Sequence, residues 1–228
     1  MKLSIPFLNR KNYVLLKCYN DNKYIVDAFP ITRGSDNINK LPKSLTDGNT
    51  GSFKTCYGHL GAKTTTATVP MWLSFHAAYI NGQPEYYLSD TQEDVVSINF
   101  GHANDPVYDH SNLCVTKIIS RWYLEEDTGV NFVYAHHIKN YTKMRVPSGI
   151  KEFKYQHGLQ LFNLLDKTDH SYTVTAGTPV VSLIPLTDKE FRVESHYDPD
   201  KVKELESTQM RAYFNNEILR RMRHSKDK

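Results

Sequence analysis

The segment VTAGTPVVSLIPL, residues 174–186, joins a turn to a continuous apolar segment and is the most organised stretch of this chain. Gly177 permits a tight turn because it has no Cβ, and Pro179 fixes the backbone where the apolar part begins. The residues from Val180 to Ile184 are typical of a strand that is buried on both faces. The segment therefore predicts a turn and an interior strand, with Leu183 buried and no ligand resting on it.

Strand-like segments separated by turn residues continue on both sides of this stretch. Asn81-Gly82 is a common type I′ pair, so residues 69–80 and 85–89 are expected to form a hairpin. A longer hairpin is expected within residues 112–140, with its turn at Asp127-Thr128-Gly129. A short helix after Gly158 is an alternative to a strand there. Further strands are expected within residues 12–30, where two would flank a turn at residues 20–22, and within residues 94–101, 150–157, 170–177 and 189–197.

The C-terminal part of the chain changes to a helical period. Asp198 can cap a helix, Pro199 suits its first position and Asp200 suits its first turn. Apolar residues then recur at intervals of three, four or eight residues, which places them on or near one stripe of a helix. These residues are Val202, Leu205, Tyr213, Phe214, Ile218 and Met222. We therefore expect a helix over residues 199–222 that packs on the β core.

Length and composition are those of one folded, β-rich domain. The chain has 228 residues, of which 39% are hydrophobic and 12% aromatic, so it can bury a core of its own. Five glycines fall between residues 32 and 68 among polar residues without periodicity, which indicates a long irregular loop. The sequence thus predicts a single domain over residues 1–228, an antiparallel β sandwich or jelly-roll-like barrel with one C-terminal α-helix.

Charge and cysteine content argue against several classes of protein. A formal net charge of +3 is too small to indicate binding to nucleic acid or to an anionic membrane. No apolar run approaches the roughly 18 residues of a membrane span, and the first residues lack the apolar core of a signal peptide. Cys18, Cys56 and Cys114 form no Cys-x-x-Cys pair, as expected of reduced thiols in an intracellular protein.

Histidines are frequent, but no complete metal-binding motif is present. His196 and Asp198 form the only His-x-Asp pair, and Asp198 is better explained as a helix cap. The segment GHANDPVYDH, residues 101–110, carries four ligand-type side chains, although its Asn-Asp-Pro is also ordinary turn chemistry. These four side chains are His102, Asp105, Asp109 and His110. We expect no cofactor, and a divalent metal at this loop stays an open alternative.

A ligand site between the sheets of a sandwich is the other candidate. It would lie near Trp72, His76 and His136, close to the 102–110 loop. His136 and His137 are adjacent on a predicted strand, so their side chains point to opposite faces and cannot both bind one ion. Cupin-type jelly rolls place a ligand histidine soon after a strand like residues 180–185, and that histidine is missing here. The 174–186 segment is therefore interpreted as scaffold.

Several short motifs carry a resemblance to a known family. They are Ile5-Pro6-Phe7, Phe29-Pro30, a loop reaching Cys56, Pro70-Met71-Trp72, GIKEFKYQ at residues 149–156 and AGTPVVSLIPL at residues 176–186. With them the chain resembles a family of uncharacterised proteins from marine bacteriophages, especially T4-like cyanophages, and from ocean sequence collections. It departs from that family at Tyr57-Gly58, where a proline commonly follows the cysteine. The resemblance implies a viral gene expressed in a bacterial cytoplasm, and it brings no established activity.

Three functional hypotheses follow from these observations. The first is a non-enzymatic phage protein, a virion or assembly component or a binding module, whose partners are other phage proteins or itself. It would be found in the cytoplasm of a bacterial host or in the virion. The alternative is a jelly-roll enzyme acting on a small molecule or a carbohydrate. A third is nucleic-acid binding by the C-terminal helix, but the helix dipole already explains Arg220, Arg221 and Arg223. We expect no membrane partner and no nucleic-acid partner.

Overall fold

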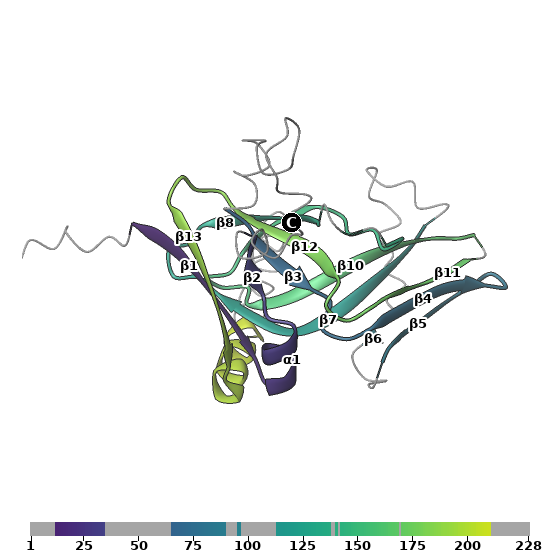
Figure 1. The fold of residues 1–228 in the computed structure, drawn as a ribbon, viewed down its shortest axis with the longest axis horizontal. Coiled ribbons are helices and arrows are strands. Elements are labelled where there is room, and N and C mark those ends of the chain that lie inside the picture. Colours follow the sequence, from purple (N-terminus) through teal and green to yellow (C-terminus); the bar gives the residue numbers. More distant parts are fainter. Residues whose placement is uncertain are drawn as a thin grey trace, which may run out of the picture.

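The structure of the protein is a computed structural model, and it describes residues 12–34, 65–89, 95–96, 113–137, 140, 142–168 and 170–210. Within these residues the chain is mainly β, with one short helix near its start and a second helix after the last strand (Figure 1). The described strands form three sheets, and no sheet closes into a barrel. The expected mainly β architecture is confirmed, and it is consistent with a sandwich.

The first sheet has the strand order β10-β7-β1-β13. Its strands are β10 (Gly158–Asp166), β7 (Leu113–Glu125), β1 (Tyr13–Asn20) and β13 (Glu190–Tyr197), and β6 (Val95–Val96) also pairs with β7. β1 and β13 run parallel, with Tyr13 opposite Glu190 and Asn20 opposite Tyr197, while the other pairs are antiparallel. The first and last strands of the described chain therefore lie side by side, a pairing that no local sequence pattern could indicate.

The second sheet has the order β2-β3-β12-β8-β9 and is antiparallel throughout. Its strands are β2 (Thr32–Arg33), β3 (Ala67–Pro70), β12 (Pro179–Pro185), β8 (Asn131–His136) and β9 (Gly149–Glu152). β12 is an interior strand, as predicted, and Leu183 is fully buried. Ser182 and Ile184 are only half-buried, so β12 is not covered on both faces as its apolar composition indicated.

The third sheet has the order β11-β4-β5 and contains the predicted hairpin. Its strands are β11 (His170–Val174), β4 (Phe75–Ile80) and β5 (Gln83–Leu88). Asn81 and Gly82 have φ angles of 51° and 78°, the left-handed pair that a type I′ turn requires. The first arm of the hairpin begins at Phe75 and not near Val69, because the chain bends between β3 and β4.

The opening stretch of sequence joins the third sheet to the second. β3 continues into β4 and β11 continues into β12, and both connections bend at the same place (Figure 1). The Met71 amide donates to the Thr178 carbonyl at 2.8 Å, and the Gly177 amide donates to the Met71 carbonyl at 2.7 Å. Gly177 has a φ of +86°, and a Cβ there would approach the Phe29 ring to 3.3 Å. The positive φ therefore favours glycine at this joint, and a larger residue would also crowd the Phe29 ring.

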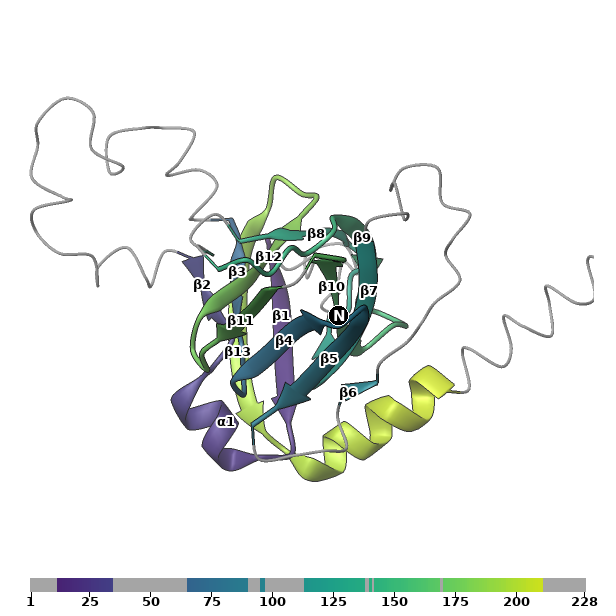
Figure 2. The same ribbon diagram turned by 90° about the vertical axis from the view of Figure 1, so that its right-hand side faces the viewer.

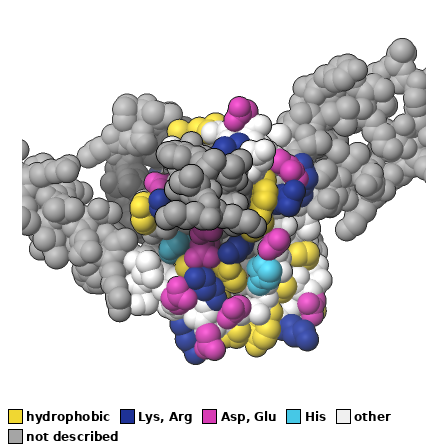
Figure 3. Space-filling model, turned by 90° about the vertical axis from the view of Figure 1, so that its left-hand side faces the viewer, with side chains coloured by type: hydrophobic (Ala, Val, Ile, Leu, Met, Phe, Trp, Pro, Cys, Tyr) yellow, Lys and Arg dark blue, Asp and Glu magenta, His cyan; other side chains and the backbone are white. Residues whose placement is uncertain are grey.

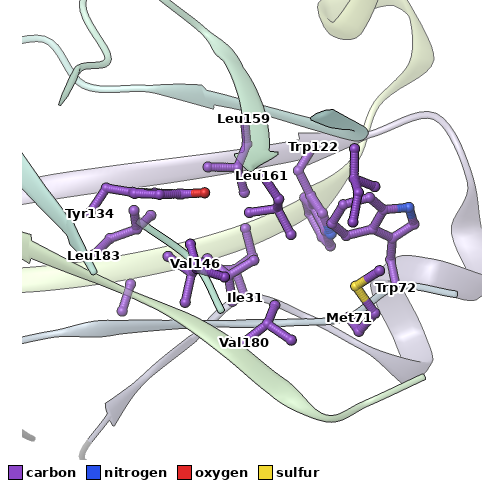
Figure 4. Close-up of a cluster of buried hydrophobic side chains, with 14 of the residues drawn as sticks. Ile31, Met71, Trp72, Trp122, Tyr134, Val146, Leu159, Leu161, Val180 and Leu183 are labelled. Carbon is purple, nitrogen blue, oxygen red and sulfur yellow. The ribbon is translucent and has the colours of Figure 1, made fainter. Parts of the chain in front are cut away.

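One hydrophobic core fills the space between the first sheet and the layer formed by the second and third. Figure 4 shows side chains from β7 and β10 meeting side chains from β12 and from the 71–72 bend. Trp72 and Trp122 are both fully buried there. Figure 2, from the side, shows β4 and β5 at the front of the molecule, with the C-terminal helix below them.

The N-terminal part of the chain corrects one expectation. Residues 20–30 do not form a second strand, because the helix α1 (Lys23–Ala28) follows β1. The Asn22 side chain accepts hydrogen bonds from the amides of Tyr24 and Ile25, at 3.0 and 3.4 Å. Asn22 is thus a helix N-cap, a role that asparagine fills as well as it fills a turn.

The expected hairpin within residues 112–140 is also wrong, although both of its strands exist. β7 belongs to the first sheet and β8 to the second, so the turn crosses between layers. Glu126 is 1% exposed, and its carboxylate accepts from the amides of Thr128, Gly129 and Val130 at 2.7, 2.8 and 3.0 Å. These hydrogen bonds satisfy backbone amides that would otherwise pair across a hairpin. They stabilise the turn that carries the chain from the first sheet to the second.

Two further expectations concern a helix after Gly158 and the long loop over residues 32–68. The alternative of a helix after Gly158 is wrong, because β10 begins there. Residues 32–33 and 67–68 of the expected loop lie in β2 and β3, and residues 35–64 lie outside the described residues.

The C-terminal helix begins as predicted. The Lys201 amide donates to the Asp198 carboxylate at 2.9 Å. Val202 and Leu205 are buried against Tyr19. The helix is described over residues 199–210, and the remaining stripe residues and the arginines lie outside the described residues. No helix in the described ranges is long and apolar enough to cross a membrane.

Candidate functional site

The candidate metal loop cannot be placed. His102, Asp105, Asp109 and His110 all lie outside the described residues. Among the residues that are described, no three histidine, cysteine or acidic side chains come together as metal ligands would. The metal hypothesis therefore depends on residues 97–112, and the described part of the chain adds no ligand set to it.

The three candidate ligand-binding residues have different environments. Trp72 is fully buried beside Trp122 in the core (Figure 4), and its Nε1 has no hydrogen-bond partner among the described residues. His136 is exposed at the end of β8, with Nε2 3.4 Å from the Asn140 carbonyl, while the neighbouring His137 is buried. His76 lies on β4 in the third sheet. They therefore do not share one environment: one is a core residue and two are on different sheets.

His76 belongs to a row of side chains that crosses the third sheet. Thr173 on β11, His76 on β4 and Tyr87 on β5 are direct cross-strand partners. The His76 and Tyr87 rings are stacked, with centroids 4.6 Å apart and planes at 23°. His76 Nδ1 lies 3.1 Å from the Thr173 hydroxyl, so the third member of the row orients the imidazole. Tyr87 is 56% exposed.

The next row on the same side of the sheet is polar and small. Ser171, Ala78 and Glu85 are cross-strand partners; Ser171 and Glu85 are exposed, whereas Ala78 between them is fully buried. Side chains two residues apart on a strand share one face, so this row lies beside the Thr173–His76–Tyr87 row. We call these six residues the outward face. It presents an aromatic pair, hydroxyl groups and one carboxylate within a short distance of one another.

The opposite face of the same sheet is anchored in the core. Phe75 is fully buried, its ring stacks on Tyr86 at 6.3 Å and meets the edge of Tyr172 at 6.5 Å. Val174 and Leu88, the cross-strand partners of Phe75, are also buried. Because the alternate residues of β4 are fixed in this way, the backbone under His76 is held in place.

Beneath that anchor lies a group of buried polar side chains that sequence reasoning missed. The Tyr172 hydroxyl donates to the Asn163 carboxamide oxygen at 2.7 Å, and Asn163 is fully buried. Asn163 pairs with Thr116 across β10 and β7, and Thr116 is also fully buried. Burial raises the pKa of Tyr86 to about 12, and the nearby Thr116 hydroxyl acts in the opposite direction. We call Tyr86, Thr116, Asn163 and Tyr172 the intersheet polar cluster.

A sequence signal for this cluster does exist. Leu161, Asn163 and Leu165 share one face of β10 and all three are fully buried. A polar residue between two apolar ones at period two marks a buried hydrogen-bonding position, provided that the strand and its buried face are known. Since a helix after Gly158 was an open alternative, that signal could not be used.

The described thiols do not provide a nucleophile. Cys18 is fully buried, and burial raises its pKa far above the usual range. Burial also raises the pKa of the half-buried Cys114, against the smaller effect of Lys167. Because the thiolate is the reactive form, burial makes both thiols poorer nucleophiles near neutral pH than an ordinary cysteine. The arrangement with the clearest chemical potential is therefore the outward face, which can stack against a flat ligand surface and hydrogen-bond to it.

The end of the molecule away from the third sheet has a different character. Figure 3 shows acidic and basic side chains interspersed there. On β13, Arg192 forms an ion pair with Glu190 at 2.9 Å and lies 4.2 Å above the Tyr13 ring. Because opposite charges are mixed and paired on this surface, it has no strong electrostatic potential of one sign that would attract a charged ligand.

Comparisons with known proteins add no relationship to this picture. No protein-family model, no curated protein and no solved structure matches the chain.

Proposed function

We propose that this chain is a non-enzymatic binding or assembly protein, and that the outward face of the β11-β4-β5 sheet is its contact surface. The observation that carries the proposal is the stack of the half-buried His76 on the exposed Tyr87, on a sheet whose other face is fixed in the core. An exposed aromatic pair on a rigid support is typical of a recognition surface and is not needed for folding.

Rigid aromatic side chains suit this role for energetic reasons. Tyrosine supplies a large contact area with few rotatable bonds, so little conformational entropy is lost when a partner binds. Here the Thr173 contact and the stacking already restrict His76, and the stacking restricts Tyr87. Tyrosine is also enriched among the residues that dominate binding energy at protein interfaces. The partner proposed is therefore a protein surface, either another copy of this chain or another protein of the same assembly.

The phage origin is part of the proposal and rests on the resemblance given by the sequence motifs. β sandwiches of the jelly-roll type are common in capsid and lectin-like domains, which favours a virion or assembly role over a soluble enzyme. The burial of the two described thiols, which raises the pKa of each, also favours a non-enzymatic role. On this proposal the protein acts in an infected bacterial cell or in the particle that leaves it.

Mass spectrometry of purified virions from a phage that carries the gene tests the assembly role. We expect the protein at many copies per particle. Detection in the infected-cell lysate but not in particles would contradict a virion role.

Metal analysis of the purified protein tests the competing enzyme hypothesis. We expect no stoichiometric metal. Stoichiometric iron, manganese or zinc would instead favour the jelly-roll enzyme, with residues 102–110 as the first place to look for its ligands.

A further inference from the structure

We infer that the intersheet polar cluster is the binding site of an ordered internal water molecule that bridges the first and third sheets. Three polar atoms there have no hydrogen-bond partner among the described groups, although each is shielded from solvent. They are the carboxamide nitrogen of Asn163, the hydroxyl oxygen of Thr116 and the hydroxyl oxygen of Tyr86. The inference is independent of the proposed contact surface, because none of these residues belongs to the outward face.

The strand pairings bring these residues together from four strands. Thr116 and Asn163 are cross-strand partners on β7 and β10, so their side chains leave the first sheet side by side. Tyr172 and Tyr86 are both partners of Ala77 and approach from β11 and β5 of the third sheet. The direct bond from Tyr172 to Asn163 fixes the distance between the two sheets at this point.

Direct bonds between the protein groups do not satisfy the cluster. The Thr116 hydroxyl is close enough to Tyr86 to lower its pKa against the effect of burial, yet the two hydroxyls do not form a hydrogen bond of ordinary geometry. The Asn163 carboxamide accepts from Tyr172 and still has its nitrogen unpaired. Turning the carboxamide over would leave its oxygen unpaired instead, so either orientation requires a further partner.

Water fits the donors and acceptors that remain. The Asn163 nitrogen can only donate, whereas the hydroxyls of Thr116 and Tyr86 can each donate or accept. A water oxygen can accept from Asn163 while its two hydrogens are donated to the hydroxyl oxygens. Three hydrogen bonds are the usual number for a buried water, and such waters occupy sites where several buried polar groups would otherwise be unpaired. An apolar ligand could make none of these bonds, and a cation such as ammonium could not accept from the Asn163 nitrogen.

A bound water would link the position of β5 and β11 to that of β7 and β10. The ring contacts of Phe75 join the three strands of the third sheet to one another, whereas the Tyr172–Asn163 hydrogen bond and the water would join that sheet to the first and give the contact a direction. The water site is therefore a positioning element that sets the angle of the third sheet on the first.

Nuclear magnetic resonance of the ¹⁵N-labelled protein tests the site. We expect a nuclear Overhauser effect between water protons and the side-chain NH₂ protons of Asn163. Its sign should be that of a long-lived internal water, and it should not arise from proton exchange with the solvent. The Thr116→Val variant removes one partner of the water and should weaken or abolish that peak. It should also shift the folding equilibrium about 5- to 150-fold toward the unfolded state, as expected when a buried group loses its partner.

The wild-type measurement keeps the test decisive if the variant fails to fold. Absence of the peak at Asn163 in the wild-type protein would overturn the inference, as would a high-resolution crystal structure in which Thr116 and Tyr86 bond directly to each other. The Thr173→Val variant is a control, because it removes a threonine hydroxyl of the third sheet that faces solvent. It should leave the Asn163 peak unchanged.

Discussion

The two faces of the β11-β4-β5 sheet differ in what their aromatic side chains contact. On the inner face Phe75, Tyr86 and Tyr172 pack against one another, and the hydroxyl groups of both tyrosines are directed into the core, where Tyr172 bonds to Asn163 of the first sheet. On the outward face the half-buried His76 stacks on Tyr87, which is exposed to solvent. Adjacent residues on one strand thus serve different purposes: the inner side chains stabilise the fold, and the outer ones are available to a partner. The same type of residue is buried or available for contact according to the side of the strand that carries it.

Replacement of Phe75 by Ala should have the largest effect on stability. Phe75 is fully buried and contacts both tyrosines of the inner face, so its removal should lower the free energy of unfolding by about 3–5 kcal/mol. Urea unfolding followed by tryptophan fluorescence measures the change. His76→Ala, one residue further along β4, is the matched control and should cost about 1 kcal/mol or less. Equal losses in the two variants would show that the two faces do not differ in this way.

Replacement of Leu183 by Ala extends the comparison to the other half of the layer. Leu183 is fully buried on the interior strand β12, so the substitution should cost about 2–5 kcal/mol in the same unfolding measurement. Ser182→Ala, its half-buried neighbour, is the control and should have little effect. A small loss for Leu183 would mean that the core near the second sheet can collapse around the cavity.

The loss of stability at alkaline pH should depend on the ionisation of Tyr86, on the inner face of the third sheet. Burial raises the pKa of Tyr86 from the ordinary value near 10 to about 12, so the folded protein holds this phenolic proton more tightly than the unfolded chain does. The associated stability is present below pH 10 and is lost as the pH rises from about 10 towards 12. For the partly exposed Tyr86 we expect a loss of up to about 1 kcal/mol per pH unit.

Unfolding midpoints measured across this pH range, for the wild-type protein and for Tyr86→Phe, test the prediction. The variant should lose stability less steeply, because it has one fewer group to ionise. Burial also raises the pKa of Tyr172, so part of the alkaline dependence should remain in the variant. An unchanged slope would mean that Tyr86 ionises without opening the sheet.

How much of this could be predicted from the sequence depends on how local each feature is. The Gly177 turn, the Asn81-Gly82 hairpin and the Asp198 cap are set by residues within four positions of one another, and all three were predicted. The crossing held by Glu126 was predicted as a hairpin, because the partners of β7 and β8 lie far away in the sequence. The parallel pairing of β1 with β13 is non-local for the same reason.

The candidate site shows the same limit. His76 could be named from the sequence, because histidine on a predicted strand is a common ligand type. Its partners Thr173 and Tyr87 could not, since they meet His76 only through the register of three strands. Trp72 was named for its residue type, and the bend at residue 71 places it in the core instead.

Replacement of Tyr87 by Ala should have the smallest effect on stability and the largest on function. Tyr87 is 56% exposed, and its loss should change the free energy of unfolding by no more than about 0.5 kcal/mol. If the outward face is the contact surface, the variant should fold normally and yet be depleted from phage particles, as measured by quantitative mass spectrometry of virions. Tyr155→Ala is the matched control, because that tyrosine is 54% exposed and lies outside the third sheet. Normal incorporation of both variants would place the contact surface elsewhere, whereas a large stability loss for Tyr87→Ala would make the outer stack part of the scaffold. Depletion of the Tyr87 variant alone, at unchanged stability, would separate the two faces by experiment.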